Sequence, residues 1–183
     1  MFRRKNKIKF LSILILCLFF ISVSCDADHG IAPKPIVNTD FGFGGNIIFY
    51  GEWPDSIKRM FLVAFKDPLL DESDFVITNM GYLTIELPLQ VQSIKYNSSI
   101  DSAYIPLIQD DTPPSVYHYV AVAQQSTEEV SLERKDWFVT GVYYVDGDTT
   151  TPGILTIPRD VFVDDINIYC DFDNPPTQPP GGN

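Results

Sequence analysis

Short apolar and alternating runs between residues 45 and 173 predict a series of β-strands. Residues 60–65 are continuously apolar, as expected of a central strand that is covered on both faces. Residues 82–87 alternate, so we expect Leu83, Ile85 and Leu87 to share the buried face of a strand. The other predicted strands are 46–50, 103–107, 116–123, 137–145, 154–157 and a last run that ends at 172.

The last run has the clearest two-residue period. Ile166, Ile168 and Cys170 share one face, while Tyr169 and Asp171 lie on the other. The first set is apolar and the second is polar or amphipathic, which is typical of a strand with one buried face. We therefore expect Cys170 in the core, where a free thiol acts as a small unreactive hydrophobe.

Turn-forming residues separate the runs, for example Trp-Pro-Asp-Ser at 53–56. Many short strands with regular turns favour an all-β fold, and we predict an antiparallel two-sheet sandwich over residues 43–173. Residues 174–183 contain four prolines and two glycines. Such a composition cannot continue a strand ladder, so we predict a disordered Pro/Gly tail there.

The first 24 residues have the three parts of an export signal. All five of their charged residues are basic and precede residue 10, an apolar run follows at 10–21, and small residues lead to Cys25. The apolar run is too short for a spanning helix, which needs roughly 20 residues. We predict a cleaved signal peptide at 1–24 and a flexible tether at 25–42.

Residues 22–25, Ser-Val-Ser-Cys, resemble the lipobox of bacterial lipoproteins. The resemblance implies that Cys25 becomes a lipidated amino terminus that anchors the protein to the outer membrane or cell surface. Two or more acyl chains give stable anchoring. The family prefers Leu where Ser22 stands, and Ser22 and Ser24 also suit an ordinary signal peptidase. A soluble secreted or periplasmic product is therefore the alternative.

A second resemblance covers about residues 45–173. It rests on Gly-Asn-Ile-Ile-Phe-Tyr-Gly-Glu-Trp-Pro-Asp-Ser-Ile at 45–57, Pro-Pro-Ser-Val-Tyr-His-Tyr-Val-Ala-Val-Ala at 113–123, and Trp137 followed by Gly-Val-Tyr-Tyr at 141–144. These segments resemble the transthyretin-like (carboxypeptidase-regulatory-like) β-sandwich modules of bacterial lipoproteins. The resemblance implies a seven-strand sandwich without enzymatic activity that has a structural or binding role.

Charge excludes one class of partner. Without the predicted signal peptide the chain keeps 8 basic and 24 acidic residues, a formal net charge of −16. Nucleic acids and anionic membrane surfaces would repel such a chain, because they are bound through Lys and Arg patches. We therefore expect a membrane contact through the lipid anchor and no nucleic-acid partner.

Catalytic residue sets are missing from the sequence. Outside the signal peptide its histidines are His29, in the tether, and His118, in a predicted strand, and no nucleophile, base and acid form a recognisable set. A zinc site would need three or four Cys or His ligands. We predict a non-enzymatic, envelope-anchored protein that has no cofactor and a structural or ligand-binding β domain, with a protein or glycan partner left open.

Two binding alternatives remain. Asp146 and Asp148 lie in a predicted loop and could offer oxygen ligands to Ca²⁺, although the glutamate that would close a twelve-residue calcium loop is missing. Solvated turn acids are the competing interpretation.

Four aromatic residues could form a glycan-binding platform of a surface adhesion module if exposed together, or could fill the core. They are Trp53, Trp137, Tyr143 and Tyr144.

Overall fold

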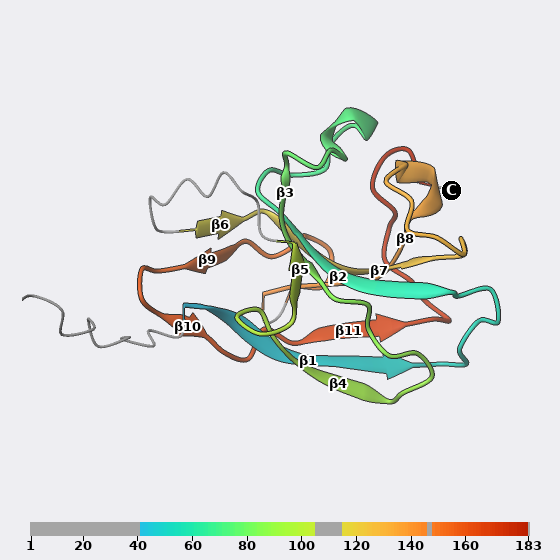
Figure 1. The fold of residues 1–183 in the computed structure, drawn as a ribbon, viewed down its shortest axis with the longest axis horizontal. Coiled ribbons are helices and arrows are strands. Elements are labelled where there is room, and N and C mark those ends of the chain that lie inside the picture. The colour runs from blue at the N-terminus through green and yellow to red at the C-terminus, as the bar shows by residue number, and fades with distance from the viewer. Residues whose placement is uncertain (1–40, 105–114, 146–147, 183) are drawn as a thin grey trace, which may run out of the picture. The chain divides into compact units, whose positions relative to one another are not determined.

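The computed structural model describes residues 41–104, 115–145 and 148–182. The predicted signal peptide, Cys25 and nearly all of the tether lie outside these residues. The described chain consists of strands and two three-residue 3-10 helices, shown in Figure 1. The elements are β1 (Gly42–Tyr50), β2 (Arg59–Phe65), η1 (Glu72–Asp74), β3 (Met80–Thr84), β4 (Ser93–Asn97), β5 (Ser102–Tyr104), β6 (Ser115–Tyr117), β7 (Tyr119–Gln125), η2 (Arg134–Asp136), β8 (Phe138–Val142), β9 (Leu155–Ile157), β10 (Phe162–Val163) and β11 (Ile168–Asp171).

The sheet topology confirms the all-β class and corrects the arrangement of strands. Within the described residues, nine strands form one curled mixed sheet in the order β10-β1-β11-β8-β7-β2-β3-β5, with β4 paired to β1, and β6 and β9 form a small second sheet. The prediction that the strands are antiparallel is wrong for β1, which pairs in parallel with both β10 and β11. The last strand enters beside the first one, a long-range pairing that local turn signals do not reveal.

A glycine allows the close approach of the chain to β1. A Cβ atom added at Gly45 would lie 2.4 Å from the carbonyl oxygen of Ile166, so a larger residue would push the two segments apart. The amide of Ile166 donates to the carbonyl of Gly44 at 2.9 Å. The glycine-rich start of β1 therefore serves strand packing.

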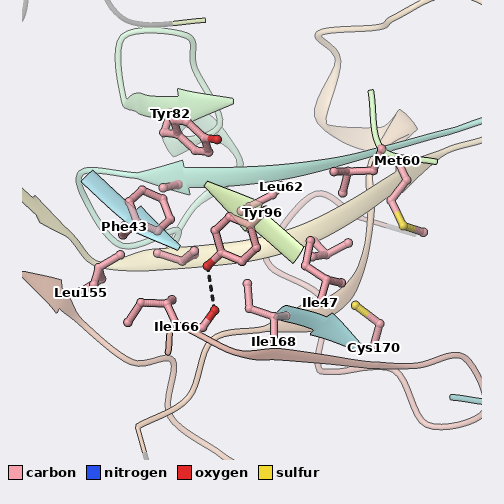
Figure 2. Close-up of a cluster of buried hydrophobic side chains, with 14 of the residues drawn as sticks. Phe43, Ile47, Met60, Leu62, Tyr82, Tyr96, Leu155, Ile166, Ile168 and Cys170 are labelled. Carbon is pink, nitrogen blue, oxygen red and sulfur yellow. Dashed lines mark hydrogen bonds between the residues drawn. The ribbon is translucent and has the colours of Figure 1, made fainter. Parts of the chain in front are cut away.

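The inner face of the curled sheet carries the larger hydrophobic cluster, shown in Figure 2. Its side chains come from β1, β2, β3, β4, β7, β9 and β11 and include the predicted core residues Ile166, Ile168 and Cys170. Tyr96 is buried among them, and its hydroxyl donates to the carbonyl of Ile166 at 2.7 Å. This bond ties β4 to the segment that leads into β11.

The outer face of the central strands carries a second cluster. Along β2, Met60, Leu62 and Ala64 face the inner cluster, whereas Phe61 and Val63 face the outer one. Every residue from 60 to 65 is buried, which confirms the prediction of a strand covered on both faces. Strand β7 alternates between the same two clusters.

The predicted buried face of residues 82–87 is wrong for Leu83 and Ile85, whereas Leu87, beyond the end of β3, is buried as predicted. Tyr82 and Thr84 point into the inner cluster region and are buried, while Ile85 is 54% exposed and Leu83 is half-buried against the outer cluster. Thr84 is tolerated in the core because its hydroxyl oxygen accepts from the amide of Leu62 at 2.9 Å. Burial of a polar group costs little when its hydrogen bond is made.

Three other strands differ from the prediction or are only partly described. The predicted strand 116–123 is divided between β6 and β7, and His118 lies at the junction. Strand β4 was not predicted, although Ile94 and Tyr96 alternate with polar residues there. Of the predicted strand 103–107, residues 105–107 lie outside the described residues.

Truncation of Ile168 tests the register of β11. Ile168→Ala should lower the free energy of unfolding by about 2–5 kcal/mol, because it leaves a cavity in the inner cluster. The matched control Ile154→Ala, at a side chain that is 55% exposed, should cost less than about 0.5 kcal/mol. Urea denaturation of both variants measures the difference, and equal losses would show that the assigned face of β11 is incorrect.

Candidate functional site

A groove of about 870 Å³ lies on the outer side of the sheet. Its walls are the loop 68–70, the turn 149–154 and the C-terminal segment 174–180, and its floor includes residues of β8 and β11. We call it the tail groove. Ligand sites are usually concave and of this size, with mostly apolar and aromatic walls and a few ordered polar groups.

Two exposed tyrosines lie side by side at β11, and one of them lines the groove. Tyr169 lines the groove and is 56% exposed, and Tyr50 of β1 is 51% exposed beside it. Their rings stack with centroids 6.3 Å apart and planes inclined by 25°. The stacking restricts how the Tyr169 ring can turn, so its orientation is largely set before any ligand arrives.

A polar turn lies next to Tyr169. Asp171 accepts hydrogen bonds from the amides of Asp173 and Asn174 and from the side-chain amide of Asn174. These bonds, led by the one from the Asn174 side chain, lower the pKa of Asp171 below its usual value. Asp171 and Asn174 both line the groove, so they form one ordered pair of acceptor and donor groups on its wall.

A second polar turn forms another wall. Asp148 Oδ1 accepts from the amide and hydroxyl of Thr150 and from the amide of Thr151, at 2.7 to 3.0 Å. The amide bonds from Thr150 and Thr151 are the main reason that the pKa of Asp148 falls to about 2. Thr150 and Thr151 line the groove and are held in place by this carboxylate.

A buried tyrosine also lines the groove. Tyr119 lies at the start of β7 and is 7% exposed, and its hydroxyl has no hydrogen-bond partner among the described residues. Burial raises the pKa of Tyr119 above its usual value. Tyr119 is one of five described residues with a buried polar side-chain atom that lacks a partner, so this hydroxyl by itself does not mark a ligand contact.

The C-terminal segment that walls the groove corrects the prediction of a disordered tail. Gln178 acts like a short strand partner of Val139: its Oε1 accepts from the Val139 amide, and its Nε2 donates to the Val139 carbonyl, each at 2.8 Å. Prolines cannot donate backbone hydrogen bonds, but here side chains provide them. Composition alone therefore did not predict the docking of residues 174–182.

Arg134 holds the same segment from the other side. Its guanidinium donates to the carbonyls of Pro179 and Pro180 at 2.8 and 3.1 Å and to the carbonyl of Trp137. Arg134 is itself buried, and Pro179 packs near Trp137 over the outer cluster. Figure 1 shows the C-terminus next to η2, the helix that begins with Arg134. The segment thus covers an apolar surface that the sheet leaves open.

The residues predicted to bind a cation, Asp146 and Asp148, are only partly described. Asp146 lies outside the described residues, as does Cys25, the predicted site of lipid attachment. Asp148 makes the turn contacts given above, which favours the interpretation as a turn acid. Within residues 41–104, 115–145 and 148–182, no three His, Cys, Asp or Glu side chains gather as metal ligands would.

The four aromatic residues of the predicted glycan platform do not lie together. Trp137 is buried in the outer cluster against Phe61 and Phe75, whereas Trp53 packs on Phe49 at the inner cluster. Tyr143 and Tyr144 pack against different clusters. Tyr144 alone of the four lines the tail groove, where Tyr169 is the exposed ring. The sequence placed Tyr169 on the outer face of its strand but gave no sign of the groove.

The two remaining candidate reactive residues, Cys170 and His118, both make contacts that are typical of a structural role. Cys170 is fully buried, and burial raises the pKa of its thiol to about 12. His118 lines the groove, and its Nδ1 lies 2.5 Å from the carbonyl oxygen of Lys66. The Cys170 thiol therefore keeps its proton at neutral pH, which makes it a poor nucleophile.

Comparison with known proteins gives no match to a family model, to a curated protein or to a solved structure. The similarity to transthyretin-like modules therefore stays a prediction. In the part of the chain that the structure describes, no helix has the length and hydropathy needed to cross a membrane.

Loss of the Gln178 side chain should show whether the C-terminal segment adds stability. Gln178→Ala leaves the amide and carbonyl of Val139 without partners, so we expect a loss of about 1–3 kcal/mol in the free energy of unfolding. The neighbouring exposed Thr177 provides the control, Thr177→Ala, which should change little. Thermal and urea denaturation measure both, and an unchanged Gln178→Ala variant would mean that the segment is not docked in solution.

Proposed function

We propose that this protein is a non-enzymatic, envelope-anchored lipoprotein whose β domain binds a ligand in the tail groove. The observation that carries the binding role is the groove itself, with its exposed ring and its two ordered polar turns. Ordered walls favour binding, because little side-chain freedom remains to be lost when a ligand arrives.

Two titratable residues of the groove, Asp171 and Tyr119, suit binding better than acid–base chemistry. A general acid or base works best with a pKa near the working pH. The pKa of Asp171 is lowered and that of Tyr119 is raised, so both shifts move away from neutrality. Asp171 is then a fixed acceptor, and Tyr119 keeps its proton.

The calcium alternative gains little support from Asp148. One of its oxygens already accepts three hydrogen bonds from Thr150 and Thr151, and the described residues near it bring no further carboxylates together. A calcium site needs six to eight oxygen ligands. We therefore favour an organic ligand.

The anchoring part of the proposal depends on Cys25. The mature protein should begin at Cys25 and carry the mass of acyl chains, and Cys25→Ala should abolish that mass. Cys17→Ala, inside the predicted signal peptide, is the matched control and should leave lipidation intact. Mass spectrometry of the mature protein decides, and a mature chain without acyl mass would establish the secreted alternative.

Small organic probes test the groove independently of the natural ligand. Crystals of the mature chain with Cys25→Ala, soaked separately in 2-propanol, phenol and acetamide, should show all three probes clustered in the tail groove near Tyr169 and Tyr119. The exposed apolar side chains Ile100 and Leu132 lie outside the groove and serve as an internal comparison. Probes that bind there equally well, or avoid the groove, would contradict a ligand site.

A further inference from the structure

We infer that the ligand of the tail groove is a neutral oligosaccharide, with one sugar ring stacked on Tyr169. This inference rests on the proposed binding role of the groove and adds the chemical class of the ligand. It draws on four features of the site: an exposed aromatic ring, ordered polar side chains beside it, the absence of cationic groups from the described walls, and the lack of a free strand edge.

The exposed ring provides the stacking surface. A pyranose presents a patch of C–H groups on one face, which packs well against the face of an aromatic ring. Tyr169 is more than half exposed and is supported from one side by Tyr50. Tyr50 and Tyr169 form an exposed aromatic pair, and contiguous exposed apolar surface often marks a binding site, whereas a single exposed ring would not. Tyr169 lines the groove, so a ring stacked on it would enter the groove.

The ordered polar groups suit sugar hydroxyls. Each hydroxyl both donates and accepts, so it pairs best with fixed acceptors and donors placed together. Asp171, two residues after Tyr169 in β11, and Asn174 provide such a pair. Thr150 and Thr151 line another part of the groove, where the Thr150 hydroxyl already donates to Asp148 and keeps its acceptor lone pairs.

The charges of the groove select for a neutral sugar. Its described walls contain Asp171 and His118 but no Lys or Arg. Arg134, the nearest guanidinium in the outer cluster, already donates to three carbonyls. A uronic acid, a sulfated sugar or a phosphorylated ligand would meet a carboxylate without a cation to balance its charge. Acidic ligands are therefore disfavoured.

A peptide fits the same surface less well. Extended peptides commonly bind by adding a strand to a free sheet edge. The floor strand β11 is paired on both sides, with β1 and with β8, and β8 is also paired with β7. The groove therefore offers side chains and no unpaired strand, which suits a sugar better than an extended chain.

Binding to defined oligosaccharides tests the inference. Titration calorimetry of the purified mature protein would use neutral hexasaccharides of glucose, xylose, mannose and N-acetylglucosamine, an acidic hexagalacturonate, and a synthetic peptide of residues 174–183. We expect at least one neutral hexasaccharide to bind and both the acidic sugar and the peptide to bind at least tenfold more weakly.

Variants of the exposed ring separate stacking from hydrogen bonding. Tyr169→Ala should weaken binding of that hexasaccharide by tenfold or more, whereas Tyr169→Phe keeps the ring and should stay within about threefold. Leu132→Ala, at an exposed side chain outside the groove, is the control and should bind normally. Circular dichroism of the purified variants should match that of the unmodified protein.

Each other outcome overturns the inference. Preference for the acidic sugar or for the peptide would assign the groove to another ligand class, and binding that survives Tyr169→Ala would place the sugar elsewhere. If no neutral sugar binds while small organic probes still cluster in the groove, the ligand class is wrong and the binding role stands. If the probes also avoid the groove, both proposals fail.

Discussion

The fold depends on one constraint: the central strands of the sheet are apolar on both faces. From Met60 to Phe65 every side chain of β2 is buried, and β7 repeats the pattern beside it. A sheet of this kind cannot leave either face in water, because each exposed apolar side chain would forfeit about 1.5–3 kcal/mol of burial. The structure has to cover both faces, and it does so by two different means.

The inner face is covered by the sheet itself, which curls so that β1, β4 and β11 pack over β2, β3 and β7 (Figure 2). The outer face is covered by chain that is not in strands. The loop after β2 contributes Leu69 and Phe75, and the segment after β11 contributes Pro179, which Arg134 holds in place. Because these covers do not extend over β11, Tyr169 stays exposed and a groove forms at their border. The candidate site is thus a consequence of how the outer face is covered.

The sequence predicted those parts of this arrangement that follow from the spacing of apolar residues along a few neighbouring positions. The strands around 60–65 and 166–172, the buried Cys170 and the outward Tyr169 all follow from local patterns of apolar residues. The reversed face of β3 does not, because Thr84 looks like a surface residue until the hydrogen bond from Leu62 is known. The parallel pairing of β1 with β11 joins residues more than a hundred positions apart, and turn signals describe only neighbouring strands.

The C-terminal segment shows why composition misled the prediction. A run of prolines and glycines has few backbone donors and no ladder of its own, so it is typical of a linker. Here the donors come from elsewhere, from the Gln178 side chain and the Arg134 guanidinium, and the apolar surface comes from the outer cluster. No local pattern could reveal a docking surface that exists only after the sheet has formed.

Residues 174–182 dock on the outer face as its cover and form one wall of the candidate site. Backbone ¹⁵N relaxation of the intact mature protein tests this docking most directly, at the amides of Asn174, Thr177, Gln178 and Gly181. The docked segment predicts order parameters close to the ~0.85 of rigid backbone. Values below ~0.6 at these four amides would mean a mobile tail, an uncovered outer face and no groove as described.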